Sequence, residues 1–277
     1  MRQPVLRGAA RRLLVITLSA LAVGAVTGQA QAASGCFGHK PTIVGTNGPD
    51  GLEGTPGRDV IAGKGGHDVI NGLGGDDLVC GDRGRDKLFG QGGVDKLRGG
   101  RGDDSIFAGV GDDLLYGDRG ADLSHGQRGD DVVRGGASRD TLGDEAGQDV
   151  IRGGRGRDAI FVAHDSRDDV FDGGASRDEI FFAIFGGPVT VDLATGQASG
   201  NGDDLVKSIE VVLGTDRADT LLGDGRANLL LGFGGADDIE GRGGDDFLSG
   251  GGGTDSLDGG NGTDTCKTGE TVLNCEA

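Results

Sequence analysis

The feature that most constrains this chain is an acidic residue that recurs every nine positions. Aspartate occupies this position without interruption from residue 50 to residue 158, and the spacing resumes at Asp169 after two extra residues. A second array between residues 210 and 264 keeps the same spacing, with Glu210 and Asn228 in place of aspartate. Such a period is typical of a solenoid, in which each repeat is one structural unit stacked on its neighbours.

A large apolar residue follows two positions after almost every periodic acid. Ile106 follows Asp104 in this way, and only Ser124 and Cys266 depart from the pattern. Successive side chains of a β-strand point to opposite faces, so the middle residue of a three-residue strand can face inward in every repeat. Each unit is therefore predicted to be a six-residue turn that ends in the acid, followed by a short strand that adds one side chain to a continuous inner seam.

Glycine is abundant in this chain and bulky residues are scarce. The 277 residues include 61 glycines, aromatic residues make up 4%, and tryptophan is absent. Without the repeat, this composition would be typical of a disordered chain, because little apolar surface is available to offset the entropy lost on folding. The formal net charge of −18 argues against nucleic acid as a partner, since its phosphates would be repelled.

Two units carry the repeat most clearly, Gly-Gly-Arg-Gly-Asp-Asp-Ser-Ile-Phe at residues 99–107 and Gly-Gly-Arg-Gly-Arg-Asp-Ala-Ile-Phe at residues 153–161. Both resemble the nonapeptide of the RTX, or haemolysin-type, calcium-binding repeat family, G-G-x-G-x-D-x-U-x with U large and apolar. The resemblance runs from about residue 45 to 181 and from 205 to 267. It implies an all-β fold, a parallel β-roll or β-solenoid with two repeats per coil, and several calcium ions held between stacked turns.

The resemblance implies that the periodic aspartates and the turn carbonyls are calcium ligands. Calcium takes six to eight oxygen ligands, and glycine permits turns that aim carbonyls at an ion. The alternative is a metal-free solenoid in which aspartate and glycine serve only as turn residues. However, carboxylates stacked about 4.8 Å apart would repel one another without cations. The candidate calcium ligands are Asp59, Asp68, Asp77, Asp86, Asp95, Asp104, Asp113, Asp122, Asp131, Asp140, Asp149, Asp158, Asp169, Asp178, Asp219, Asp237, Asp246, Asp255 and Asp264.

Several units depart from the repeat, and the sites that they would form are expected to be weak or empty. Ser138 and Ser176 replace a turn glycine, Asn228 replaces the acid, and Ser124 places a hydroxyl in the apolar seam. From residue 182 to 208 the repeat is lost. We expect this segment to be a spacer that continues the β stack without binding calcium, and the alternative is a functional insert.

The first 32 residues are predicted to be a secretory signal peptide. Four arginines precede an apolar run from Leu13 to Val26, and Ala30-Gln31-Ala32 is a small-x-small cleavage site. Cleavage would take the formal charge from −18 to −22. The run is short for a membrane span, so a retained anchor is the less favoured alternative. We expect a secreted protein with no membrane span after cleavage.

Four cysteines lie in the predicted exported part, where an oxidising compartment permits disulfides. Three pairings are possible. Cys266 and Cys275 would close a short C-terminal loop, and Cys36 with Cys80 would tie down the start. The expected organisation is a signal peptide (1–32), a first RTX block (33–181), the spacer (182–208), a second RTX block (209–267) and a C-terminal disulfide cap (268–277).

No catalytic motif accompanies the repeat. The four histidines are scattered, and no HExxH or GxSxG sequence occurs. Paired acids such as Asp76-Asp77 recur with the repeat, which indicates a ladder rather than one catalytic pair. We therefore expect a non-enzymatic, monomeric, structural or adhesive module that binds calcium and cell-surface or matrix components. The alternatives are a secreted binding or toxin-like effector and a non-catalytic accessory of a secreted hydrolase.

Overall fold

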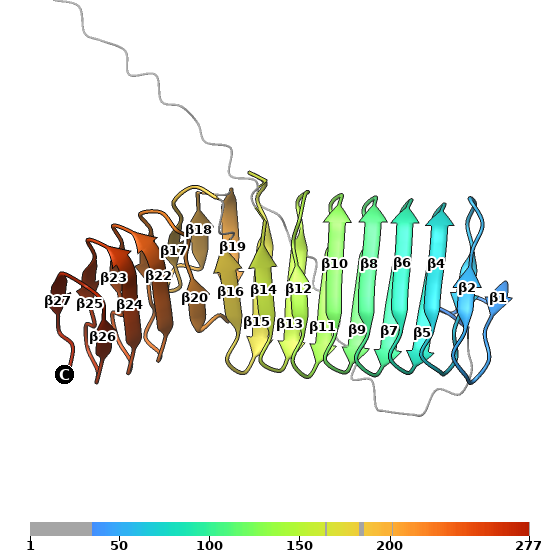
Figure 1. Cartoon of the computed structure of the whole chain (residues 1–277), viewed down its shortest axis with the longest axis horizontal. Helices are drawn as coiled ribbons and strands as arrows, with labels where there is room; N and C mark the ends of the chain where they lie inside the picture. The colour runs from blue at the N-terminus through green and yellow to red at the C-terminus, as the bar shows by residue number, and fades with distance from the viewer. Residues whose placement is uncertain (1–34, 164, 183–185, 201, 277) are drawn as a thin grey trace, which may run out of the picture. The chain divides into compact units, whose positions relative to one another are not determined.

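The computed structural model describes residues 35–163, 165–182, 186–200 and 202–276, and the predicted signal peptide lies outside the described residues. The described part contains 27 β-strands and no helix, so none of it has the form of a membrane-spanning helix. The chain alternates between two sheets as it winds forward, which produces a stack of coils (Figure 1). The all-β parallel β-roll predicted from the repeat is confirmed.

The two sheets contain strands that alternate along the chain. The first has 15 strands in the order β1 (Ile43–Val44), β3 (Val60–Ala62), β5 (Leu78–Arg83), β7 (Lys96–Arg101), β9 (Leu114–Arg119), β11 (Val132–Ala137), β13 (Val150–Arg155), β15 (Val170–Ala175), β19 (Asp203–Lys207), β18 (Gln197–Ser199), β17 (Thr190–Asp192), β21 (Thr220–Leu222), β23 (Asp238–Glu240), β25 (Ser256–Asp258) and β27 (Thr271–Leu273). The second has 12 strands in the order β2 (Gly51–Glu53), β4 (Val69–Gly74), β6 (Lys87–Gly92), β8 (Ser105–Val110), β10 (Leu123–Arg128), β12 (Thr141–Gly143), β14 (Ala159–Val162), β16 (Glu179–Phe182), β20 (Val211–Leu213), β22 (Leu229–Gly235), β24 (Phe247–Gly253) and β26 (Thr265–Lys267).

The apolar seam fills the space between the two sheets. Equivalent residues of successive coils pair in parallel, as Leu97 of β7 does with Leu115 of β9. The predicted seam residues form one cluster and are almost all fully buried. Ser124 lies in the same column between Ile106 and Leu142, and its hydroxyl is buried without a hydrogen-bond partner among the described residues. The core is therefore one side chain wide in each sheet. The predicted three-residue strands occur at β3 and β12, but many strands of the first block, such as β8, are six residues long and extend into the predicted six-residue turn.

In most turns of the first block, two positions where the repeat calls for glycine have different conformational requirements. Four residues before the acid, φ is positive, but residues other than glycine can adopt it, as Leu73 does with a φ of 79°. Two residues before the acid, φ reaches 125° at Gly102, and a Cβ there would lie 1.6 Å from the carbonyl oxygen of Gly84 in the preceding coil. Ser138 and Ser176 occupy this second position with φ values of 102° and 113°, so their backbones are strained.

The predicted spacer interrupts the parallel order of the first sheet. β19 pairs in parallel with β15, whereas β18 pairs antiparallel with both β19 and β17. β17 then pairs in parallel with β21, which begins the second block in this sheet. The three spacer strands β17, β18 and β19 thus lie in the same sheet as the repeats on either side.

Disulfides join both cysteine pairs that the sequence favours, Cys36–Cys80 and Cys266–Cys275. Cys80 is on the outer face of β5, yet only 2% exposed, because the segment around Cys36 covers it. Phe37 extends this cover, with the Arg98 guanidinium 4.5 Å from its ring centroid. The N-terminal disulfide therefore fastens a segment to the outer face of the first sheet, which the spacing of the cysteines could not show.

Candidate metal sites

The periodic aspartates form ladders at the points where turns lead into strands. The backbone N–H of Asp86 donates to Oδ1 of Asp104, 18 residues later and one coil along, at 2.8 Å, and Asp104 donates in the same way to Asp122. One ladder joins Asp50, Asp68, Asp86, Asp104, Asp122, Asp140, Asp158 and Asp178. The other joins Asp59, Asp77, Asp95, Asp113, Asp131, Asp149 and Asp169. The second block forms two shorter ladders, Asp219–Asp237–Asp255 and Asn228–Asp246–Asp264.

The second carboxylate oxygen of most ladder aspartates is buried without a hydrogen-bond partner in the described chain. A buried polar atom of this kind costs several kcal/mol unless a partner is supplied. A whole row of them requires protons or cations. The predicted ligands with such an Oδ2 atom are Asp68, Asp77, Asp86, Asp95, Asp104, Asp113, Asp122, Asp131, Asp140, Asp158, Asp169, Asp178, Asp237, Asp246, Asp255 and Asp264.

A backbone carbonyl lies close to these oxygens. A Cβ placed on Gly81, five residues before Asp86, would lie 2.5 Å from Asp86 Oδ2 and 2.9 Å from the carbonyl oxygen of Gly99 in the next coil. The glycine thus leaves a small space lined by oxygen atoms, and the arrangement recurs along the ladders. Carboxylate and carbonyl oxygens are the ligands that calcium prefers. The ladder aspartates and turn carbonyls therefore fit calcium, whose charge would compensate the stacked carboxylates.

Burial raises the pKa of several ladder carboxyls. Removal from water is the largest cause and raises the pKa of Asp104 and of Asp131 to about 8 and that of Asp140 to about 7, with repulsion from neighbouring ladder acids adding to it. Asp103, which precedes Asp104, is exposed and has a lowered pKa, because the N–H of Ala121 and the side chain of Arg85 donate to it. Position in the turn therefore separates two adjacent aspartates electrostatically.

Two predicted ligands, Asp59 and Asp219, are bonded within their own turns. Thr55 donates to Asp59 Oδ2 from its N–H at 2.6 Å and from its hydroxyl at 2.9 Å. Thr215 donates to Asp219 Oδ2 in the same way, at 2.6 and 3.2 Å. Each of these Oδ2 oxygens therefore already accepts two hydrogen bonds. A Gly-Thr pair at the start of the turn marks this arrangement in the sequence. The assignment of Asp59 and Asp219 as calcium ligands stays a prediction.

Asn228, which stands at an acid position, differs from the ladder aspartates. Its Oδ1 accepts the N–H of Asp224 at 2.9 Å, and its Nδ2 is buried without a partner in the described residues. An amide nitrogen donates hydrogen bonds and does not bind a cation. A site built on this turn lacks one anionic ligand.

The structure adds acids that the list of candidate ligands left out. Asp204 accepts the N–H of Asp169 at 3.0 Å and carries one ladder into the spacer, and its Oδ2 is buried and unpartnered. Glu210 ends the other ladder of the first block, and Glu270 and Glu276 end the ladders of the second. Asp204 follows Asp169 by 35 residues, so a search by period does not find it.

Comparison with known sequences agrees with this geometry. The profile described as RTX calcium-binding nonapeptide repeat (4 copies) matches residues 53–88, 89–123, 125–160, 213–248 and 231–266, more than half of the chain. The chain belongs to the RTX calcium-binding nonapeptide repeat family. No curated protein matches the chain significantly. The RTX matches lie in both blocks and leave out residues 161–212. This gap contains the whole spacer, where the repeat and the parallel strand order are both interrupted.

Proposed function

We propose that this RTX protein is secreted, folds when it binds calcium, and serves as a structural or adhesive module outside the cell. The row of buried carboxylate oxygens without partners carries the calcium-dependent part of this proposal. The formal charge of −18 opposes compaction of the metal-free chain. Each bound ion would offset carboxylate charge and hold adjacent turns together, so that the free energy of binding becomes free energy of folding.

Two features support an extracellular location. The N-terminal residues have the composition of a signal peptide, and disulfides such as Cys36–Cys80 and Cys266–Cys275 persist in oxidising compartments. Extracellular modules bind calcium with dissociation constants of about 10⁻⁴–10⁻³ M. At such an affinity the chain would stay unfolded at the low calcium concentration inside a cell and fold after export.

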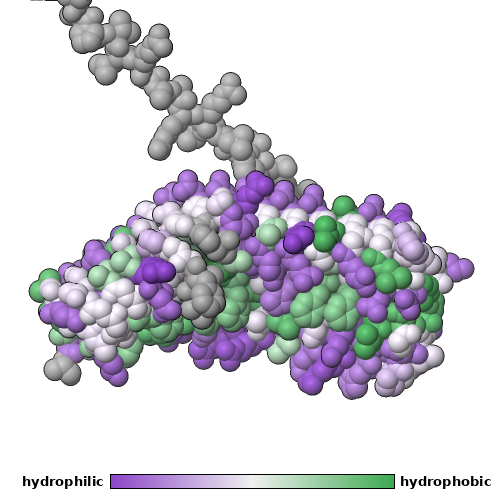
Figure 2. Space-filling view, turned by 45° about the horizontal axis from the view of Figure 1, so that its top comes forward, coloured by the Kyte–Doolittle hydropathy of each residue, from purple (hydrophilic) through white to green (hydrophobic). Residues whose placement is uncertain are grey.

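The outer face of the roll supports a role in binding other surfaces. Phe89, Phe107 and His125 stack along β6, β8 and β10 with ring centroids 5.6 and 5.5 Å apart, and Phe161 stacks on Phe181 farther along the same sheet. On the face shown in Figure 2, apolar residues form a band along the roll with polar residues at its edges. Partly exposed aromatic rows offer flat apolar contact area to a partner.

We assign no catalytic role to the acids, because their arrangement repeats from coil to coil. The alternatives are a binding or toxin-like effector and a non-catalytic accessory of a secreted hydrolase. A pull-down with and without calcium separates these functions. Calcium-dependent retention on the producing cell's surface or matrix supports the proposed module, whereas retention on foreign cells supports the effector. Co-purification with a hydrolase supports the accessory role.

Removal of calcium is expected to unfold the chain. In the presence of chelator, the far-ultraviolet circular dichroism spectrum should be that of a disordered chain. The spectrum should become β-rich when calcium is added to about 1 mM. Magnesium at the same concentration is the control, because it requires a stricter octahedral geometry at shorter distances. A β-rich spectrum that chelator does not change would contradict calcium-dependent folding.

A further inference from the structure

One turn of the roll carries an aspartate where most others carry glycine. Asp144 lies five residues before Asp149, the position that Gly135 holds relative to Asp140. A Cβ on Gly135 would lie 2.5 Å from Asp140 Oδ2, because that position faces the oxygen-lined space beside the ladder. The side chain of Asp144 therefore projects into the space that glycine leaves open in the regular turns.

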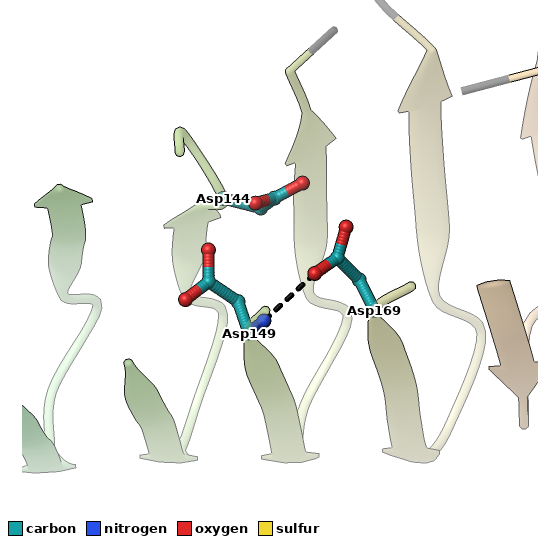
Figure 3. Close-up of side chains that lie close together, drawn as sticks. All are labelled: Asp144, Asp149 and Asp169. Carbon is teal, nitrogen blue, oxygen red and sulfur yellow. Dashed lines mark hydrogen bonds between the residues drawn. The ribbon is translucent and has the colours of Figure 1, made fainter. Parts of the chain in front are cut away.

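Asp144 brings a third carboxylate to two successive rungs of a ladder. One oxygen from each of Asp144, Asp149 and Asp169 lies within 4.8 Å of the other two. The three side chains converge from adjacent coils (Figure 3), and the N–H of Asp149 donates to Asp169 Oδ1 at 2.7 Å. Asp144 is 3% exposed and the other two are 2% exposed. Three carboxyl groups thus share one buried space.

The carboxyl group of Asp144 has no partner that would justify its burial. Both of its oxygens, and Oδ2 of Asp169, lack a hydrogen-bond partner among the described residues. Either a proton or a cation must therefore compensate the third carboxylate.

We propose that Asp144, Asp149 and Asp169 form a calcium site that is distinct from the regular repeat sites and is the tightest in the roll. Calcium affinity of oxygen-based sites depends on the number of charged ligands and on the rigidity of the site. A regular turn has glycine at the position of Asp144 and supplies no carboxylate there. This inference rests on calcium as the ligand of the roll, and it identifies the site that fills first.

The proposed site lies where the register of the repeat shifts, so an ion that binds there first would affect how the neighbouring coils come together. Asp149 and Asp169 are 20 residues apart, whereas the rungs before Asp149 in this ladder are 18 apart, so the site spans the shift in register. Asp165, in the extra segment, accepts the N–H of Gly147 at 2.9 Å. An ion held here would join the coils on the two sides of the irregular segment before the regular sites fill.

Equilibrium dialysis of the full chain against buffered free calcium tests this site. The wild type is expected to bind one ion at a free calcium concentration about ten or more times lower than the concentration at which the other ions bind. Asp144→Asn keeps the size of the side chain and removes its charge, so it should lose that ion. Asp144→Gly restores the residue of the regular turns, and it should move the ion to the weaker class without changing the total bound at saturation. Asp130→Asn, which removes an exposed acid from a nearby turn, should retain the tight ion.

Three results would overturn the inference. Tight binding by Asp144→Asn equal to the wild type would mean that Asp144 is a protonated partner of Asp149. A single class of sites in the wild type would exclude a tightest site. If Asp144→Asn does not fold in saturating calcium, as judged by circular dichroism, an unchanged tight class in Asp144→Gly would contradict the inference. Absence of calcium binding at any site would overturn the proposed function itself.

Discussion

At the scale of single residues, the turns place chemically identical neighbours in opposite environments. Asp104 is 2% exposed and its Oδ2 has no partner in the described chain, whereas Asp103 is exposed and bonds to Arg85 at 3.0 Å. The repeat register alone distinguishes them, because Asp104 ends its turn and Asp103 occupies a variable position. Substitutions at these two positions therefore test the register directly.

Asp104→Asn is expected to raise the calcium concentration at the folding midpoint by about threefold or more, because it removes an anionic ligand and neighbouring coils fold together. Asparagine keeps an oxygen that can accept the N–H of Asp86, so the ladder hydrogen bond is retained. Asp103→Asn makes the same charge change at an exposed position and should leave the midpoint unchanged. The measurement is circular dichroism during a calcium titration at fixed ionic strength. Equal midpoints would mean that the register is wrong.

The sequence predicted the positions of the ladder acids but not the state of each carboxylate. A nine-residue period places an acid at the end of a turn, and it cannot show that Thr55 already satisfies Asp59. It also cannot show that Asp144 occupies the space beside the ladder, since this depends on how adjacent coils stack. Asp204 was missed because the chain leaves the period before returning to the sheet.

At the scale of the turn and strand, the residue two positions before the acid limits the backbone most. Glycines at this position reach φ values such as 125° at Gly102, and Ser138 is held at 102°. A residue with a side chain in this region is strained by about 1–3 kcal/mol. Replacing such a residue with glycine removes the strain, but part of this stabilisation is lost because glycine loses more conformational entropy on folding.

Ser138→Gly is therefore expected to raise the free energy of unfolding by about 1 kcal/mol. The matched control is Ser105→Gly at the first residue of β8, where φ is not positive; it should lower the free energy of unfolding by about 0.5–1 kcal/mol. Denaturant unfolding in saturating calcium measures both. If the two substitutions changed stability in the same direction, backbone strain would not explain the φ of Ser138.

The strands themselves were predictable only where the repeat persists. The period indicates parallel stacking from β2 onward, because equivalent residues one coil apart must pair. In the spacer the period is lost, and alternation of apolar and polar residues does not indicate strand direction. The antiparallel pairing of β18 with β17 and β19 therefore had no sequence signal.

At the scale of the whole molecule, the ladders link stability to pH. In an unfolded chain an aspartate carboxyl has a pKa of about 3.9. In the metal-free roll, burial raises the pKa of Asp104 and Asp131 to about 8 and of Asp140 and Asp169 to about 7. A raised pKa in the folded state means that these groups favour folding at low pH. Their contribution is complete below about pH 4 and is lost as the pH rises through 7–8.

Calcium-depleted protein is thus expected to have more β-structure at pH 4.5 than at pH 8, as measured by circular dichroism at fixed ionic strength. Calcium binding should change in the opposite direction, with a higher calcium midpoint at pH 6 than at pH 8, because protons compete with the ion for the same carboxylates. A metal-free chain with more β-structure at pH 8 than at pH 4.5 would contradict the linkage.

The hydrogen bonds within each ladder all point the same way along the chain. The donor N–H belongs to the earlier coil, and the acceptor carboxylate arrives 18 residues later in most rungs. Each of these turns therefore needs the following coil in place before its backbone N–H has an acceptor. Glu270 and Glu276 provide the acceptors for Asp255 and Asp264 in the second block. A partly folded roll therefore has two unlike ends: its C-terminal edge exposes ladder N–H groups without acceptors, and its N-terminal edge exposes carboxylates without donors.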